Sequence, residues 1–246
     1  MGAVGTVADG VNNTLALTAD ALTTLNVTGD QAFTFSTADT QTKLATIDAS
    51  ANTGGAVISA AATITATNAA LTIKGSATAS NSLTGSANAD TIVGGAKADV
   101  ITGGKGGDTL TGKGGNDKFM FAAGDSSIGT GKFDTITDFV ANTKGAGVNG
   151  AVTAVGATGV AAADLTGDVL SFAKLATDGK IIIDVLNSAA DATTFLANNT
   201  GSGSFVAALD KSSSNLYVDN TNDGVADFYI HLTGVTTIDA AAIVLA

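Results

Sequence analysis

The stretch GSANADTIVGGAKADVITGGKGGDTLTGKGGNDKFM, residues 85–120, places an aspartate at every ninth position. The four aspartates, which we call the aspartate ladder, are Asp90, Asp99, Asp108 and Asp117. A glycine stands five residues before each of them, and a large apolar residue stands two residues after it. Glycine accepts positive φ and favours tight turns, and the three residues after each aspartate favour a short strand. With one inward apolar side chain per strand, the stretch predicts a narrow parallel β-roll.

The same period predicts a ligand. If two nonapeptides make one turn of the roll, Asp90 lies beside Asp108 and Asp99 lies beside Asp117. Stacked strands are about 4.8 Å apart, and two carboxylates roughly 5 Å apart repel by about 3 kcal/mol at an effective dielectric near 20. A cation between the loops would remove this repulsion. Carboxylate and glycine-loop carbonyl oxygens suit Ca²⁺ better than Mg²⁺ or Zn²⁺; the alternative is a Gly-rich solenoid without metal.

The units resemble the RTX repeat family, whose nonapeptide is G-G-x-G-x-D-x-U-x with an apolar residue at U. Residues 94–111 agree with this pattern except at Lys97, whereas Ser86, Asn88 and Lys113 replace glycines in the first and last units. The resemblance implies a β-roll that binds several Ca²⁺ ions as its cofactor.

A further element follows the repeats. The segment FDTITDF, residues 133–139, resembles the D-x-I-x-D-F element that follows the last nonapeptide in RTX proteins. That resemblance implies that Asp134 and Asp138 complete a terminal Ca²⁺ site; the alternative is a short strand with two exposed carboxylates. The candidate metal ligands are then Gly85, Ala87, Asp90, Gly94, Gly95, Ala96, Asp99, Gly103, Gly104, Lys105, Asp108, Gly112, Gly114, Asp117, Asp134 and Asp138.

The residues upstream of the repeats are rich in Thr and Ala. Short alternating segments predict strands of a wider parallel β-solenoid that stacks on the roll. These segments are residues 25–27, 33–35, 45–47, 64–67 and 71–73. The stretch GSATASNSLT, residues 75–84, resembles a degenerate repeat that is one residue longer and lacks the aspartate.

The region downstream of the repeats predicts a mainly β fold with one helix. Residues 188–198 predict that helix, with Ser188 as its N-cap, and residues 141–165 predict loop or strand decoration. Strands are predicted at residues 168–172, 180–184, 204–210, 215–219 and 226–232. We therefore expect an all-β fold in three parts: solenoid coils over residues 1–84, the calcium-binding roll and its exit strand over 85–140, and a β-rich region over 141–246.

A second acidic cluster spans residues 219–227. It approximates the calcium loop D-x-[DN]-x-[DN]-G, but Ile230 stands where an EF-hand needs Glu. We expect a hairpin turn built from Asp, Asn and Gly, and the alternative is an incidental Ca²⁺ ion.

Composition narrows the function. The 246 residues carry a net charge of −11, which argues against nucleic acid as a partner. The absence of Glu and the single histidine, His231, exclude an HExxH protease within this chain, and His231 is expected at an exposed strand position. No Cys, G-x-S-x-G elbow or Walker loop is present, so we do not expect an enzyme.

Neither a signal peptide nor a stretch as long as a transmembrane helix is apparent, and the start resembles an added Met on an internal boundary of a longer protein.

The whole pattern resembles the C-terminal part of surface-layer proteins of Gram-negative bacteria. Residues 216–234 and the apolar end resemble the uncleaved signal for type I secretion. The resemblance implies a structural protein that is secreted to the cell surface and assembles with neighbouring S-layer subunits. The other expected partners are the type I ABC transporter and, through sequence upstream of residue 1, cell-surface lipopolysaccharide. The alternative is the RTX domain of a secreted enzyme, such as a serralysin-like protease or a lipase, or of an adhesin.

Overall fold

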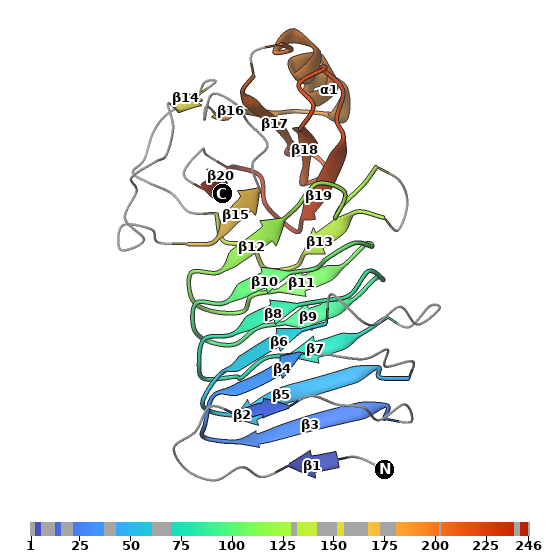
Figure 1. The fold of residues 1–246 in the computed structure, drawn as a ribbon. Coiled ribbons are helices and arrows are strands. Elements are labelled where there is room, and N and C mark those ends of the chain that lie inside the picture. Colours follow the sequence, from blue (N-terminus) through green and yellow to red (C-terminus); the bar gives the residue numbers. More distant parts are fainter. Residues whose placement is uncertain are drawn as a thin grey trace. The chain divides into compact units, whose positions relative to one another are not determined.

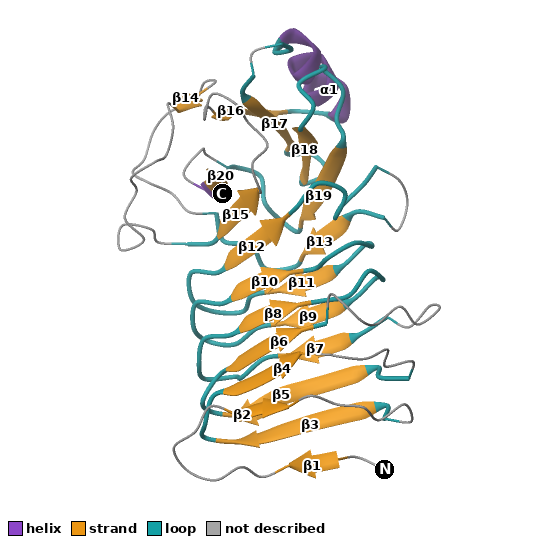
Figure 2. Ribbon diagram, in the orientation of Figure 1, coloured by secondary structure: helices purple, strands orange, loops and turns teal. Residues whose placement is uncertain are grey.

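The chain forms two compact units in a computed structural model, the first being Met1–Asp117 and the second Lys118–Ala246. In the part of the chain that the structure describes, strands predominate, many of them in parallel pairs, and one short helix accompanies them, which confirms the predicted all-β fold class (Figures 1 and 2). The structure describes residues 3–5, 13–15, 22–36, 43–60, 70–128, 132–141, 152–154, 167–172, 181–201, 203–238 and 242–245.

The first unit is a parallel β-solenoid whose successive strands alternate between two sheets. One sheet has the order β1 (Ala3–Gly5), β3 (Thr24–Gly29), β5 (Thr46–Asn52), β7 (Thr72–Lys74), β9 (Thr91–Val93) and β11 (Thr109–Thr111). The other has the order β2 (Asn13–Leu15), β4 (Phe33–Ser36), β6 (Ala56–Ser59), β8 (Ser82–Thr84) and β10 (Val100–Thr102). Two strands therefore make one coil, and coils stack along the unit (Figure 1).

The core of the first unit is a column of apolar side chains, because each strand from β3 to β11 points at least one large residue inward. The register places these residues directly above one another, and each is almost fully buried. In one sheet the column is Leu25, Ile47, Ile73, Ile92 and Leu110. In the other sheet it is Phe35, Ile58, Leu83 and Ile101. Full burial of such a side chain stabilises a fold by about 1.5–3 kcal/mol, so the predicted inward position drives the stacking.

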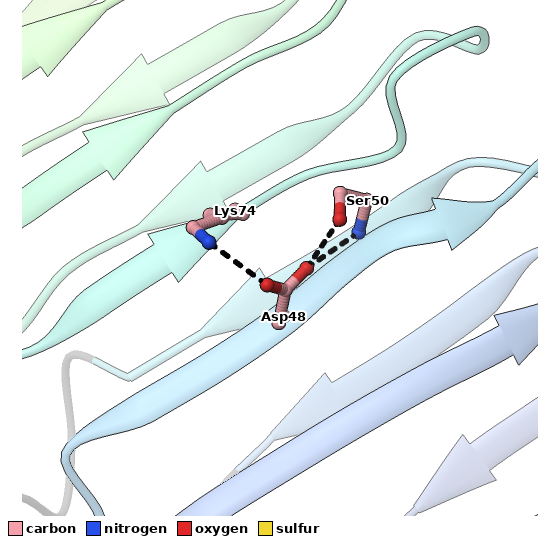
Figure 3. A network of polar contacts seen from close by, with 3 residues as sticks. All are labelled: Asp48, Ser50 and Lys74. Atoms are coloured by element: carbon pink, nitrogen blue, oxygen red, sulfur yellow. Dashed lines mark hydrogen bonds and ion pairs between the residues drawn. The ribbon is translucent and has the colours of Figure 1, made fainter.

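A polar contact also joins two upstream coils. The pairing of β5 with β7 sets Asp48 opposite Lys74, and their Oδ2 and Nζ atoms lie 3.0 Å apart. Oδ1 of Asp48 accepts hydrogen bonds from the backbone N–H (3.0 Å) and the hydroxyl (2.5 Å) of Ser50, as Figure 3 shows. Burial raises the pKa of Asp48, but these hydrogen bonds and Lys74 outweigh it, so the pKa lies below the ordinary value.

The second unit combines a mixed sheet with a short parallel one. The mixed sheet has the order β13 (Asp134–Ile136), β19 (Phe228–Leu232), β18 (Asn215–Asp219), β17 (Phe205–Asp210), β16 (Ile181–Leu186) and β14 (Val152–Ala154). The parallel sheet consists of β12 (Lys118–Phe121), β15 (Val169–Phe172) and β20 (Ile243–Leu245). Phe172 packs against Phe121, Phe205 and Phe228, with ring centroids 4.8–6.2 Å apart, and anchors the core of this unit.

The helix α1 (Ala189–Asn198) begins where the sequence predicts it. The hydroxyl oxygen of Ser188 accepts a hydrogen bond from the Asp191 N–H at 3.3 Å, which confirms Ser188 as the N-cap. Ala192 and Leu196 of the helix pack on Val206 and Ala208 of β17. No helix in the described part of the chain has the length and apolarity to cross a membrane.

Some predictions fall outside the described residues. These are the predicted strand at 64–67 and, apart from residue 141 and β14, the predicted decoration over 141–165. The division of the sequence into 1–84, 85–140 and 141–246 stays a prediction.

Candidate calcium-binding site

Each aspartate of the ladder stands at the end of a glycine-rich loop, directly before a strand. Asp90 precedes β9, Asp99 precedes β10, Asp108 precedes β11 and Asp117 precedes β12. All four side chains are only 1–2% exposed. A carboxylate is rarely buried to this extent unless it is paired, hydrogen-bonded or bound to a metal.

The loops stack in the pairs that the sequence predicts. The Asp90 N–H donates a hydrogen bond to Oδ1 of Asp108 at 2.7 Å, and the Asp99 N–H donates to Oδ1 of Asp117 at 2.8 Å. Both bonds join residues eighteen positions apart. Two nonapeptides therefore make one turn, and the structure brings each carboxylate against the loop of the preceding turn.

The glycine that opens each loop is required by a close approach of the aspartate. A Cβ atom at Gly94, Gly103 or Gly112 would overlap Oδ2 of the aspartate five residues later. Each carboxylate therefore lies in a cradle that only glycine leaves open. Carbonyl oxygens also face these cradles, since a Cβ atom at Gly85 would overlap the oxygen of Gly103.

Backbone donors orient the carboxylates within their own loops. The Ser86 N–H donates to Oδ2 of Asp90 at 2.5 Å, and the Gly95 N–H donates to Oδ2 of Asp99 at 2.6 Å. Burial raises the pKa of both aspartates, and their hydrogen bonds offset the loss of solvation only in part. The charged forms therefore lack full compensation from these neighbours, and a cation would stabilise them.

The arrangement fits a hard cation held by carboxylate and carbonyl oxygens together. In the residues that the structure describes, no three side chains of Asp, Glu, His or Cys converge as a metal site. A cation here would need loop carbonyl oxygens beside two carboxylates, which is the donor set of a flexible Ca²⁺ site. The roles of Gly85, Ala87, Gly95, Gly104 and the other loop residues as carbonyl ligands remain predictions.

Asp134 and Asp138 lie in the second unit. Asp134 is buried, and its N–H donates to the hydroxyl oxygen of Ser126 at 3.0 Å, while Asp138 is partly exposed. The alternative of two exposed carboxylates is therefore wrong for Asp134. Their part in a terminal Ca²⁺ site stays a prediction.

The acidic cluster at 219–227 forms the expected hairpin turn between β18 and β19. Asp219 accepts a hydrogen bond from the Gly224 N–H at 2.8 Å, and Asp227 accepts one from the Thr221 N–H at 2.8 Å. These carboxylates close the turn. His231 is partly exposed on β19, with Nδ1 2.9 Å from Oδ1 of Asn215.

Sequence reasoning missed one residue, Asn81, that continues the line of the aspartate ladder upstream. The pairing of β8 with β10 sets Ser82 opposite Val100, so Asn81 occupies the position of an aspartate beside Asp99. The extra residue in the degenerate unit hid this alignment. The available signal was the spacing from Asn81 to Asp99, which equals that between paired ladder aspartates.

Residues 84–119 match the family model of the RTX calcium-binding nonapeptide repeat, in four copies. No curated protein matches the chain. The match confirms the RTX repeats, which bind calcium and indicate a secreted calcium-binding protein.

Proposed function

We propose that this chain is a structural surface-layer protein in which Ca²⁺ drives folding and then lattice assembly after type I secretion. The observation that carries the proposal is the stacking of buried carboxylates, Asp90 with Asp108 and Asp99 with Asp117, in glycine cradles.

Folding depends on how each loop holds its carboxylate. The backbone N–H groups of Ser86 and Gly95 turn Oδ2 of Asp90 and Asp99 toward their loops, and the next turn supplies the paired carboxylate. Without a counter-charge these buried groups repel one another, which loosens the roll. Bound Ca²⁺ supplies positive charge between the pairs, so its binding free energy becomes folding free energy. Extracellular calcium modules typically bind at about 10⁻⁴–10⁻³ M, far above cytosolic levels.

The described surface favours polar contacts between copies over an apolar patch. Among the described residues, the exposed large apolar side chains are Val57 on β6 and Ile128, Val140 and Val225 in three separate loops. Large exposed apolar patches mark many stable interfaces. Lattice contacts that use Ca²⁺ and polar side chains are compatible with this surface and with the net charge of −11.

A calcium titration of the purified chain tests folding and assembly together. Circular dichroism is expected to report gain of β structure as Ca²⁺ rises into the millimolar range, and light scattering is expected to rise with it. Electron microscopy should then show two-dimensional sheets. Mg²⁺ at the same concentration should produce neither change, because Mg²⁺ demands a tighter octahedral site.

A circular dichroism spectrum that is the same in chelator and in Ca²⁺ would contradict the folding switch. A chain that folds with Ca²⁺ but stays monodisperse at millimolar Ca²⁺ would contradict the lattice role. That second result would favour the calcium-binding domain of a secreted enzyme or adhesin.

A further inference from the structure

Asn81 stands on the aspartate ladder without being an aspartate. Asn81 is buried, with 5% of its surface exposed, and its backbone carbonyl oxygen accepts a hydrogen bond from the Val100 N–H at 2.9 Å. Its own N–H donates to Oδ1 of Asp99 at 2.7 Å, as the Asp99 N–H does to Asp117. Asn81, Asp99 and Asp117 therefore form one line at equal spacing along one face of the roll.

The side-chain amide of Asn81 has a defined orientation. Its Oδ1 accepts hydrogen bonds from the Ser76 N–H at 2.7 Å and from the Ala56 N–H at 3.2 Å. Since both neighbours of this atom are donors, it is the oxygen end of the amide. The Nδ2 atom is consequently the donor end of the amide, and Oδ1 of Asp99 is among its acceptors.

Three oxygens surround Nδ2 of Asn81. They are Oδ1 of Asp99 at 2.9 Å and the carbonyl oxygens of Ser76 and Ala79, each at 3.0 Å. An amide nitrogen has only two hydrogens, so this cage holds more acceptors than the amide has donors. One carboxylate and two loop carbonyls are also the kind of ligands expected between the calcium-binding loops.

We propose that Asn81 ends the aspartate ladder by placing an amide where the repeats place a Ca²⁺ ion. The NH₂ group then joins the loop at residues 76–81 to the loop at 94–99, and the junction with the upstream coils holds without metal. This inference rests on the proposed binding of Ca²⁺ between the stacked loops.

The line of Asp90 and Asp108, on the opposite face of the roll, also meets fixed protein donors at its upstream end, but through a different residue. There the position beside Asp90 belongs to Leu71, whose N–H donates to Oδ1 of Asp90 at 2.8 Å and whose side chain has no polar atom. The hydroxyl of Ser86 donates to the same oxygen at 3.2 Å. Fixed protein donors thus meet the first aspartate on each face, and on the Asp99 face that donor is the Asn81 amide.

The substitution Asn81→Asp tests the inference, because it exchanges NH₂ for a carboxylate oxygen of nearly the same shape. Calcium stoichiometry is measured by equilibrium dialysis, and the melting temperature is measured in chelator and in millimolar Ca²⁺. The variant is expected to bind one more ion per chain than the parent. It should melt several degrees below the parent in chelator and recover in Ca²⁺.

Two control variants separate the possible causes. Asn81→Ala removes the amide without adding a ligand, so it should melt lower than the parent in both conditions and bind no extra ion. Asn187→Asp adds the same charge at an exposed position in the second unit and should change neither stoichiometry nor recovery.

The inference is overturned if Asn81→Asp binds the same number of ions as the parent, or if Ca²⁺ does not restore its melting temperature. Failure of that variant to fold even in Ca²⁺ counts as the second of these outcomes. A parent that binds no Ca²⁺ refutes the proposed function itself, and the parent measurement alone reveals this.

Discussion

Asp108 combines the features of a ladder residue. It is buried, its Oδ1 accepts the Asp90 N–H at 2.7 Å, and its Oδ2 fills the cradle at Gly103. An asparagine can keep the acceptor oxygen and the shape, but it loses the charge that holds a cation. Charge and structure at this residue can therefore be separated experimentally.

We predict that Asp108→Asn raises the Ca²⁺ concentration needed for half-maximal folding at least tenfold, which corresponds to about 1.4 kcal/mol. In chelator the variant should be no less stable than the parent, because one buried repulsion is gone. Circular dichroism during Ca²⁺ titration measures both effects. The control is Asp223→Asn, in the exposed turn of the second unit, and equal midpoints for the two variants would contradict the prediction.

Lys113 occupies a backbone conformation suited to glycine. Its φ is 72°, and the equivalent Gly104 in the preceding unit has a φ of 99°. A left-handed conformation costs a residue with a Cβ roughly 1–2 kcal/mol, whereas glycine in the unfolded chain adds an entropy cost of about 0.5–1 kcal/mol. The strain exceeds the entropy term.

Lys113→Gly is accordingly expected to raise the free energy of unfolding by up to about 1 kcal/mol in saturating Ca²⁺. Urea unfolding measures the change. Lys105→Gly is the matched control, since it removes the same charge from the neighbouring loop at an exposed residue whose own φ is not positive. A gain of equal size in both variants would assign the effect to charge instead of strain.

At the level of elements, the upstream coils are joined by groups of the protein itself. Lys74 reaches Asp48 across β5 and β7, and Nδ2 of Asn52 donates to the carbonyl oxygen of Gln31 at 2.9 Å. The pKa of Asp48 is lowered, so its ionised form stabilises the folded state. That contribution is present above the pKa of the unfolded chain and disappears as pH falls through the lower, folded-state pKa.

Asp48→Asn should therefore reduce the free energy of unfolding by about 0.2–1 kcal/mol at pH 7, the range for exposed ion pairs. The difference between variant and parent should shrink as the pH falls below the unfolded-state pKa of Asp. Urea unfolding at pH 7 and at pH 3, with Asp30→Asn as an exposed control, tests this. A difference that is independent of pH would show that Asp48 acts only through its shape.

The elements differ in how far sequence could predict them. The strands and stacking of the repeats were predictable, because the nine-residue period, the glycine cradle and the inward apolar residue agree. The order of the strands in the upstream coils was not predictable, because the sequence separation of paired residues changes from coil to coil, as the pairs Thr24–Thr46 and Thr46–Thr72 show. Asn81 was missed since its unit contains an extra residue, although Ser188 correctly marked the start of α1.

At the scale of the chain, the first unit contains two kinds of coil. Upstream coils, as far as the structure describes them, are held by apolar columns, the Asp48–Lys74 pair and the amides of Asn52 and Asn81. The coils of residues 85–117 have the same apolar column but bring carboxylates together. Removing Ca²⁺ should therefore act on one part of this unit and not on the other.

Hydrogen–deuterium exchange with mass spectrometry measures this division directly. In chelator, peptides from residues 85–117 should lose protection, because repulsion between the paired aspartates opens their loops and the strands that follow. Peptides covering β3–β6 should keep their protection, since their columns and polar contacts need no metal. Ca²⁺ should restore the protection of residues 85–117 and Mg²⁺ should not. In Asn81→Asp the loss of protection should extend across residues 76–84, because the amide that closes the junction is gone. In the parent chain, a uniform loss of protection across the whole first unit would contradict the division.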